Sequence, residues 1–460
     1  MSNYRLDYHI APTFGFMNDP NGLVQFNGKY HVFYQWLDQL QAQGPKSWGH
    51  VASHDLVHWE TYECALQPDQ WYDKDGCYSG SAIVHEDTLY LFYTGNVRTE
   101  SGDRETYQCL ATSTDGEQFT KHGPIIHLPE GYTPHFRDPK VWKDRAAQQW
   151  WMVIGAQTQA LTGNVALYRS DDLWNWTYQG NMLPDTRNWG YMCECPDLVT
   201  VADQQYMIVS RQEKIQRDGR ELDQCIPYYF AGQMQPDAQF LLYSGQEQQL
   251  DEGWDYYAPQ SFVDEQGRVL SFAWMGGGEI DYQMAQPTVP DGWLHALTIP
   301  RELIAGPGGM KQRPVAELQK LRQHERSYHL ALAGHEDVSE TVLPVTSHVQ
   351  EMWLAFGDVQ HWQLLLLDGV QLHYSAESGQ AILKRRNWWT GQWDERVLVL
   401  PNGLQQLHVF IDRSSVELFI NDGEKTATMR VFFDSAADTI RLSGCTNVNV
   451  KVWELSKEEL

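Results

Sequence analysis

The chain has 460 residues, a formal net charge of −26 and an apolar fraction of 42%. A chain of this length exceeds what one hydrophobic core normally supports, so we expect two domains. The acidic balance argues against nucleic acid and against an anionic membrane as partners, because both are bound through clustered Lys and Arg. The 19 Trp and 23 Tyr favour a binding site for flat ligands such as sugars or bases.

The amino terminus, residues 1–8, lacks the apolar core of a signal peptide, and no apolar run is long enough to cross a membrane. Seven cysteines at irregular spacing form neither a paired framework nor a Cys-x-x-Cys motif. These features predict a cytoplasmic protein with reduced thiols, no metal and no cofactor. A leader sequence lost from the chain is the alternative.

Pairs of short apolar runs separated by turn residues recur in the first part of the chain and are typical of β-hairpins. The first runs are 23–26, 82–85, 140–142, 198–201 and 261–263, and the second runs are 29–36, 88–95, 149–156, 205–211 and 268–275. In the first three units a Ser-x-Asp motif with an aromatic four residues later follows: Ser53, Asp55 and Trp59; Ser113, Asp115 and Phe119; Ser170, Asp172 and Trp176. Units of roughly 55 to 60 residues with about four strands each predict a five-bladed β-propeller. A β-sandwich meander with accidental periodicity is the alternative.

The first strand of each unit begins with a group of polar residues, which we call a polar knot. The five knots are residues 18–19, 79–81, 137–138, 194 and 258–260. The inner strands of a propeller run alongside the central channel, so their starting ends meet at one mouth. We therefore expect the carboxylates of Asp19, Asp138 and Glu194 to converge there.

The sequence pattern changes after the propeller, which is expected over residues 1–302. Residues 303–326 read as a linker in which 314–322 form a short helix with one apolar face. Alternating strands follow at 362–367, 397–400, 407–411, 416–420, 439–442 and 448–453. A tight turn is expected at Asn421-Asp422-Gly423. Residues 327–460 thus predict a C-terminal antiparallel β-sandwich, and the whole chain belongs to the all-β class.

Three carboxylates crowded together repel, so one of them should hold a proton at neutral pH. A carboxylate beside a protonated carboxyl is the arrangement that glycoside hydrolysis needs. The apolar residues 192–195 around Glu194 favour it as the acid, because an apolar neighbourhood raises a carboxyl pKa. Asp19, among turn donors, and Asp138, beside Arg137, are expected to stay ionised.

Each of these residues also has a simpler interpretation. Asp19 in an Asn-Asp-Pro-Asn-Gly run is a common turn residue, and Arg137-Asp138-Pro139 is a common local ion pair. The three acids could instead hold a structural Ca²⁺ or Mg²⁺, although no Asp-x-Asp-x-Asp loop accompanies them. The shared position in the repeat favours the catalytic interpretation.

Three blocks of the sequence, MNDPNG at 17–22, RDP at 137–139 and ECPD at 194–197, resemble the signature motifs of glycoside hydrolase family 32. This family contains invertases, sucrose-6-phosphate hydrolases, inulinases and levanases. Similar supporting blocks are FYQ at 33–35, WGH at 48–50, YSGS at 78–81, YAPQ at 257–260, IPRE at 299–302 and DRSSVE at 412–417. The resemblance covers nearly the whole chain.

The resemblance implies a five-bladed propeller followed by a β-sandwich, and retaining cleavage of β-fructofuranosides. It assigns Asp19 as the nucleophile, Glu194 as the general acid and then base, and Asp138 as a residue that binds fructose hydroxyls. Retention implies that the carboxyls of Asp19 and Glu194 lie roughly 5 to 5.5 Å apart. The substrate-binding residues it suggests are Phe16, Asn18, Gln35, Trp48, Tyr78, Ser79, Arg137, Gln260 and Trp274.

Several positions depart from the family pattern. Phe16 stands where Trp is usual and Tyr78 where Phe is usual, so an aromatic wall is kept. Cys193 and Gln43 replace aromatic residues, which thins the lining on the leaving-group side. That side is therefore expected to accept sucrose, sucrose 6-phosphate or short fructo-oligosaccharides.

Other functions remain compatible with the same fold. A fructosyltransferase would pass the fructosyl unit to a sugar, and an arabinanase-like propeller enzyme would invert the anomeric centre. A lectin-like propeller would bind sugar without needing an acid at Glu194. We expect a β-fructofuranosidase that acts on a small sugar, as a monomer or homodimer, with the sandwich in a structural role.

Overall fold

The structure is a computed structural model that describes residues 3–41, 43–144, 148–184, 187–217, 219–235, 239–243, 247–333 and 340–457. The chain forms two compact units. One unit comprises Gly15–Leu250 and Tyr257–Trp274, and the other comprises Met1–Phe14, Asp251–Tyr256 and Met275–Leu460. Over the described ranges, no helix is long and apolar enough to span a membrane.

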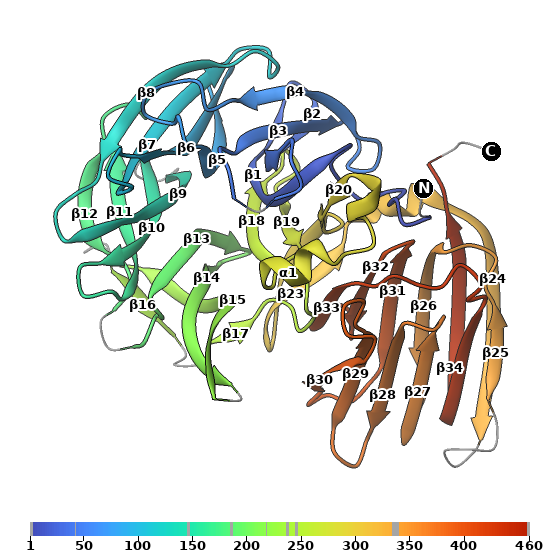
Figure 1. The fold of residues 1–460 in the computed structure, drawn as a ribbon. Coiled ribbons are helices and arrows are strands. Elements are labelled where there is room, and N and C mark those ends of the chain that lie inside the picture. Colours follow the sequence, from blue (N-terminus) through green and yellow to red (C-terminus); the bar gives the residue numbers. More distant parts are fainter. Residues whose placement is uncertain are drawn as a thin grey trace. The chain divides into compact units, whose positions relative to one another are not determined.

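The first unit carries the propeller, whose blades follow one another along the chain (Figure 1). Blade one is β1 (Gly15–Phe26), β2 (Lys29–Leu37), β3 (Ser47–Ser53) and β4 (Glu60–Leu66), and blade two is β5 (Cys77–His85), β6 (Thr88–Arg98), β7 (Arg104–Ser113) and β8 (Thr120–His127). Blade three is β9 (Tyr132–Asp144), β10 (Gln149–Thr158), β11 (Gly163–Ser170) and β12 (Thr177–Asn181). Blade four is β13 (Met192–Val201), β14 (Gln204–Arg217), β15 (Arg220–Met234), β16 (Phe240–Leu242) and β17 (Gln248–Gln249), and the fifth blade begins with β18 (Tyr257–Val263) and β19 (Val269–Met275).

The innermost strands of the five blades close a ring. Strand β1 contacts β5, β5 contacts β9, β9 contacts β13, β13 contacts β18, and β18 contacts β1. Figure 1 shows these strands around the centre of the propeller, with the later strands of each blade outside them. The five-bladed propeller is therefore confirmed, and the sandwich meander is excluded for this part of the chain.

The Ser-x-Asp motifs form the same turn in the first three blades, between the third and fourth strands. In blade one the Ser53 hydroxyl donates to Asp55 Oδ1 at 3.1 Å, and the backbone N–H groups of residues 57 and 58 donate to the same oxygen. Asp115 and Asp172 accept the equivalent bonds in blades two and three. Because a carboxylate that bonds the backbone two residues on holds a turn locally, this part of the repeat was readable from the sequence.

The polar knots lie inside the inner strands rather than at their starts. Each coincides with an irregular register, or bulge, between the first and second strands of its blade. On the inner strands, these bulges lie at residues 17–20, 78–80, 137–140, 194–197 and 257–260. At three of these bulges a non-glycine residue has a positive φ: Asp138 at 67°, Cys195 at 45° and Ala258 at 48°. A bulge bends a strand and redirects its side chains, which is why it recurs beside functional sites.

The second unit contains short helical segments and a large antiparallel sheet system. The helical segments are α1 (Ile280–Met284) and the 3₁₀ turns η1 (Val289–Asp291) and η2 (Ala316–Leu321). The short strands are β20 (Trp293–Leu294), β21 (Ala296–Leu297), β22 (Arg301–Gly306) and β23 (Gly309–Pro314). The large sheet contains β24 (Arg322–Ala333), β25 (Thr341–Pro344), β26 (Val349–Phe356), β27 (His361–Leu366), β28 (Val370–Ser375), β29 (Gln380–Arg386), β30 (Trp393–Val399), β31 (Gln406–Asp412), β32 (Ser415–Ile420), β33 (Lys425–Arg430) and β34 (Thr439–Leu455). The helix expected at 314–322 is thus a single 3₁₀ segment, with Leu318 and Leu321 buried.

Strand β34 joins the two halves of the sandwich-like sheet. Its first half pairs with β27 and β25, and its second half pairs with β26 and β24. The two strands expected at 439–442 and 448–453 are therefore one strand. Gly444 permits this continuity, since it has a φ of 137° and an added Cβ would lie 2.5 Å from the His361 carbonyl oxygen. Side chains from both halves, such as Leu364 and Leu418, share one buried core.

Two of the family-like blocks, IPRE and DRSSVE, meet in a buried ionic network of the second unit. The Arg301 guanidinium donates to Asp251 Oδ2 at 3.1 Å and to Glu417 Oε2 at 2.5 Å. His9 bridges Glu417 and Asp412 with contacts of 2.9 and 2.7 Å. Since Arg301 is only 1% exposed, these motifs serve the packing of this unit.

Replacing Arg301 by methionine is expected to lower the free energy of unfolding by about 3 to 5 kcal/mol, because two buried carboxylates lose their cation. The measurement is the denaturant midpoint of the full chain. Arg386→Met, which removes an exposed arginine from the same unit, is the matched control and should change stability by less than about 0.5 kcal/mol. Equal midpoints for the two variants would contradict the role given to Arg301.

Candidate active site

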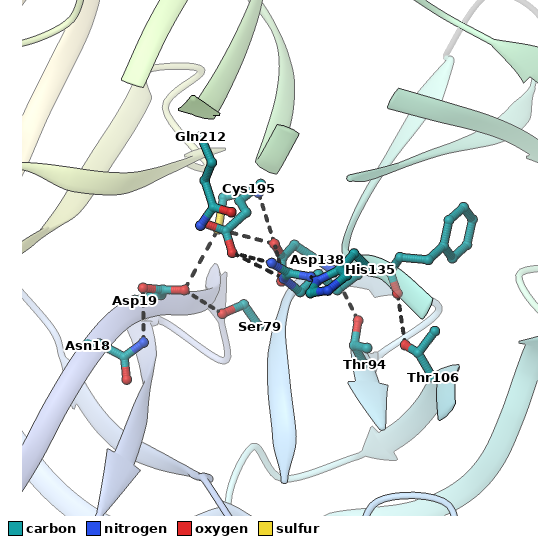
Figure 2. A network of polar contacts seen from close by, with 12 residues as sticks. Asn18, Asp19, Ser79, Thr94, Thr106, His135, Asp138, Cys195 and Gln212 are labelled. Atoms are coloured by element: carbon teal, nitrogen blue, oxygen red, sulfur yellow. Dashed lines mark hydrogen bonds and ion pairs between the residues drawn. The ribbon is translucent and has the colours of Figure 1, made fainter. Parts of the chain in front are cut away.

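The inner strands bring the three predicted carboxylates into one network of polar contacts (Figure 2). Asp19 comes from β1, where its Oδ1 accepts from Asn18 Nδ2 at 3.0 Å and its Oδ2 from the Ser79 hydroxyl at 2.8 Å. The Cys195 thiol lies 3.8 Å from Asp19 Oδ2 and 3.6 Å from Asp138 Oδ2. Asp19 and Asp138 therefore face a common neighbour, although they are far apart in the chain.

Asp138 lies at the bulge of β9 and is 3% exposed. Its backbone N–H donates to the Thr94 hydroxyl at 3.0 Å, and its Oδ2 accepts from the backbone N–H of Cys195 at 3.0 Å. The left-handed backbone conformation of Asp138 is thus held from two neighbouring blades. Such constraints fix the direction of its carboxylate.

The Glu194 carboxylate, on β13, is surrounded by donors. Arg137 donates to its Oε1 through Nε at 3.1 Å and Nη2 at 2.6 Å. Gln212 Nε2 and the Tyr257 hydroxyl each donate to its Oε2 at 2.6 Å. A hydroxyl donates to a carboxylate and accepts from a carboxylic acid, so the Tyr257 contact suits both protonation states of Glu194.

These contacts correct the expected apolar neighbourhood of Glu194, which is wrong. Successive side chains of a strand point to opposite faces. Cys193, one residue before Glu194, accordingly lies in a buried cluster with Val153 and Trp189, away from the carboxylates. Its small size therefore leaves the lining around Glu194 unaltered.

Electrostatics oppose the expectation that Asp138 stays ionised, and they raise the pKa of Asp19 as well. Burial and the charge of Glu194 raise the pKa of Asp19, although its hydrogen bonds from Ser79 and Asn18 act in the opposite sense. Burial raises the pKa of Asp138 to about 7, against the opposing effect of Arg137. Arg137 is committed to Glu194 and lies 4.0 Å from Asp138 Oδ2. Besides burial, the charge of Glu194 raises the pKa of both Asp19 and Asp138, so the expected repulsion is present.

The Asp138 shift implies a specific pH dependence of stability. Its folded-state pKa exceeds the unfolded value of about 3.9, so between about pH 4 and pH 7 the native state binds the extra proton and stability falls as pH rises. Asp138→Asn removes this titrating group. The unfolding free energy of the variant minus that of the unmodified protein should therefore be about 1 to 3 kcal/mol larger at pH 8 than at pH 5.

Asp172→Asn is the control for this pH measurement. Backbone N–H donors, that of Asn175 foremost, lower the pKa of Asp172 to about 2, so its stabilisation is complete above about pH 4 and is lost only in acid. The difference in unfolding free energy between Asp172→Asn and the unmodified protein should be the same at pH 5 and pH 8. A pH-independent difference for Asp138→Asn as well would contradict the burial argument.

Aromatic residues lie next to these acids. The rings of Phe16 and Trp274 lie 6.3 Å apart, and those of Trp274 and Tyr257 lie 6.4 Å apart, both with edge-to-face geometry. The Lys46 ammonium lies 4.9 Å from the centroid of the Phe16 ring. Burial lowers the pKa of Lys46 to about 8, while the charge of Asp19 acts in the opposite sense.

The remaining residues expected to bind substrate divide into two groups. Ser79, Asn18 and Arg137 bond the carboxylates directly. Gln35 and Trp48 lie behind them, where Gln35 Nε2 donates to the Cys77 carbonyl at 2.9 Å and Trp48 Nε1 donates to the Tyr78 carbonyl at 3.1 Å.

Trp48 has no exposed surface, so the structure places it in the core, where it supports the strand that carries Ser79. Gln260 is also buried, at 3% exposed, and no hydrogen bond joins it to the three acids among the described residues. Tyr78 is half-buried beside the Arg104 guanidinium, 5.9 Å from its ring centroid.

Two residues that bond Glu194, Tyr257 and Gln212, were not predicted from the sequence. Tyr257 occupies, in the fifth unit, the position that Asn18 and Arg137 hold in theirs, one residue before the pre-proline position. Aligning the knots on their prolines would have found it. Gln212 gave no such signal, because it faces Met192 across the strand pair β13–β14 and belongs to no motif.

Carboxylates in this arrangement are suited to acid–base and nucleophilic chemistry. In the described part of the chain, no group of three or more His, Cys, Asp or Glu side chains has the geometry to hold a metal ion. The structural cation considered from the sequence therefore has no site there. The acids instead have protein donors as partners.

Comparison with known proteins identifies the family. Residues 9–314 match the N-terminal domain model of glycosyl hydrolases family 32, and residues 317–454 match the C-terminal one. The chain is 39% identical to the sucrose-6-phosphate hydrolase of Bacillus subtilis, covering 98% of this chain and 94% of that protein. It is 37% identical to the raffinose invertase of Escherichia coli, over 95% of this chain and 90% of that protein.

Solved structures agree with this assignment. The sucrose-6-phosphate hydrolase of Lactobacillus gasseri superposes with a TM-score of 0.87 at 30% identity, covering 99% of this chain and 94% of that one. A variant of the β-fructofuranosidase of Bombyx mori, solved with sucrose, superposes with a TM-score of 0.84 at 30% identity, over 98% of this chain and 94% of that one. The chain belongs to glycosyl hydrolases family 32 and is a glycoside hydrolase.

Proposed function

We propose that this protein is a retaining β-fructofuranosidase that releases fructose from sucrose 6-phosphate, sucrose or short fructo-oligosaccharides. One observation carries the proposal: Asp19 and Glu194 lie in one polar network but have different partners. Asp19 accepts from the neutral side chains of Asn18, Ser79 and Cys195, whereas Glu194 is held by the Arg137 guanidinium and by the Tyr257 hydroxyl. Two carboxyls in different environments are the usual basis for separate nucleophile and acid–base roles.

In the first step, an Asp19 oxygen attacks the anomeric carbon of the fructosyl unit. The bond from that carbon to the leaving oxygen breaks, its electron pair stays on this oxygen, and Glu194 supplies the proton. Asn18 and Ser79 hold the attacking carboxylate in position. The result is a fructosyl ester on Asp19 and a free leaving group.

In the second step, the Glu194 carboxylate takes a proton from water as the water oxygen attacks the same carbon. The ester bond to Asp19 breaks, and fructose leaves with its original anomeric configuration. Asp138, held by Thr94 and Cys195, accepts hydrogen bonds from fructose hydroxyls as positive charge develops on the ring. Arg137 keeps Glu194 in place throughout.

The relatives favour a phosphorylated substrate, because two of those named above are sucrose-6-phosphate hydrolases. A raffinose invertase among the relatives keeps sucrose-type substrates in consideration. We also propose that the protein is cytoplasmic and that it is a monomer or a homodimer. Light scattering of the purified protein would test the oligomeric state.

The deciding experiment measures kcat/KM on sucrose 6-phosphate, sucrose, 1-kestose and inulin, and follows the anomer first released by NMR. We expect β-fructofuranose as the first product and the highest kcat/KM on sucrose 6-phosphate. Release of the α-anomer would establish inversion and overturn the mechanism. Lasting oligosaccharide synthesis at high sucrose would indicate a transferase, and binding without turnover would indicate a lectin.

A further inference from the structure

Four nitrogen-bearing side chains gather beside Glu194 in an otherwise acidic protein. Arg98 and Arg104 face each other at the end of the strand pair β6–β7, and His135 and Arg137 belong to β9. Like charges directly opposite one another on a strand pair are destabilising. An arrangement that costs stability needs a compensating partner. Among the described residues, Arg137 is the one side chain of this cluster that forms an ion pair, with Glu194, while Asp75 accepts only the backbone N–H of Arg98.

Arg104 is the least satisfied member of this cluster. Its Nε is buried without a hydrogen-bond partner among the described residues, and its one side-chain hydrogen bond there joins Nη1 to His135 Nδ1 at 3.4 Å. No described carboxylate forms an ion pair with it. Burial and the charges of Arg137 and Arg98 lower its pKa, so the guanidinium lies in an unfavourable positive field.

His135 connects Arg104 to the catalytic network. Its Nδ1 lies 3.2 Å from Arg137 Nη1 as well as 3.4 Å from Arg104 Nη1, so it accepts from both guanidiniums. Burial and the neighbouring arginines lower the pKa of His135 to about 4, which keeps the ring neutral. The proton then resides on Nε2, which faces no described partner and remains a donor for a ligand.

The position of this cluster assigns it to one side of the reaction. In the proposed mechanism Glu194 protonates the leaving oxygen, and the chain of contacts from Glu194 through Arg137 and His135 ends at Arg104. The unsatisfied donors are therefore connected to Glu194, which protonates the leaving group, whereas Asp19 is bonded by Asn18 and Ser79.

We infer that Arg104 and His135, with Arg98 beside them, bind the phosphate of a hexose 6-phosphate leaving group. A phosphate monoester supplies up to two negative charges and several acceptor oxygens, which match an arginine fork with unused N–H groups. This inference rests on the proposed function and names the residues that select its phosphorylated substrate. Lys46, near Asp19 and Phe16, is the competing cation, on the fructosyl side of the site.

The test compares kcat/KM on sucrose 6-phosphate and on sucrose for Arg104→Gln. We expect a loss of about 10- to 100-fold on the phosphorylated substrate, the usual worth of charge-assisted hydrogen bonds, with sucrose changed by less than about threefold. Inhibition by glucose 6-phosphate should weaken in parallel, while inhibition by fructose stays the same. Arg104→Lys, which keeps the charge but loses the fork, should retain part of the preference.

Two further variants make the result specific. Arg169→Gln removes one positive charge from β11, a side chain for which the structure gives no contact with the three acids, and should leave both substrates unaffected. Lys46→Met should not reduce the preference for the phosphorylated substrate. If Lys46→Met lost the preference for sucrose 6-phosphate over sucrose while Arg104→Gln kept it, the inference would be overturned.

The remaining outcomes separate the inference from the proposed function. Equal losses on both substrates in Arg104→Gln would show that Arg104 only positions Arg137 and Glu194, and would also overturn the inference. If the unmodified protein hydrolysed sucrose but showed no higher kcat/KM on sucrose 6-phosphate, the phosphate site would be rejected. The fructosidase function would still hold. An unmodified protein that hydrolyses neither would reject both.

Discussion

Asp19→Asn is expected to lower kcat on sucrose and sucrose 6-phosphate by about 10⁴-fold or more, since removal of a nucleophile leaves only binding and electrostatic effects. An asparagine keeps the shape of the side chain and its contacts with Asn18 and Ser79, so the fold and substrate binding should survive. Steady-state kinetics with a thermal-unfolding measurement check both parts.

Asp115→Asn provides the matched control for this prediction. It makes the same carboxylate-to-amide change in a turn of blade two, where Asp115 holds the backbone N–H groups of residues 117 and 118. Activity of that variant should stay within about twofold, because surface changes remote from a site have small effects. If Asp19→Asn retained a tenth of the activity, Asp19 could not be the nucleophile.

Glu194→Gln should lower kcat on sucrose by about 10³-fold, the typical contribution of a general acid–base residue. A fructofuranosyl fluoride needs no protonation of its leaving group, so its first step should remain fast in this variant. The second step still lacks a base, and the fructosyl ester on Asp19 should therefore accumulate. Intact-protein mass spectrometry would detect the addition of one fructosyl unit.

A small anion offers an independent check on Glu194. Azide attacks a glycosyl ester without base assistance, so it should restore turnover of the fluoride in Glu194→Gln and form a fructosyl azide. Tyr257→Phe, which removes the hydroxyl on Glu194 Oε2 but leaves the carboxyl, should not respond to azide. Absence of azide rescue together with slow cleavage of the fluoride would assign Glu194 a role other than acid and base.

Much of the propeller was predictable because its determinants are local. The Ser-x-Asp turns of Asp55, Asp115 and Asp172 are closed by hydrogen bonds within a few residues. The second strand of each hairpin starts within one residue of its predicted start, whereas the first strand starts four to eight residues earlier than predicted. The second unit was less readable. Residues 439–442 and 448–453 form one strand because Gly444 allows the close approach of the His361 carbonyl, a contact between strands that no local pattern encodes.

The chemistry of the site was predictable in part. The positions of Asp19, Asp138 and Glu194 in the repeat foretold that they would meet, since the inner strands of a propeller share one axis. The raised pKa values of Asp19 and Asp138 were not foretold. The sequence places Arg137 beside Asp138, but its side chain bonds Glu194, and the pKa of Asp138 is raised by burial instead.

By itself, then, the sequence determined the repeat, its family motifs and the identity of the three acids, because each depends on residues close together in the chain. Which donors each acid receives depends instead on how the blades fold together. Tyr257 and Gln212 reach Glu194 from other strands, and Arg104 reaches His135 from another blade, because closing the ring brings distant strands together. Burial and through-space charge, which set the pKa values and leave Arg104 unsatisfied, exist only after that closure.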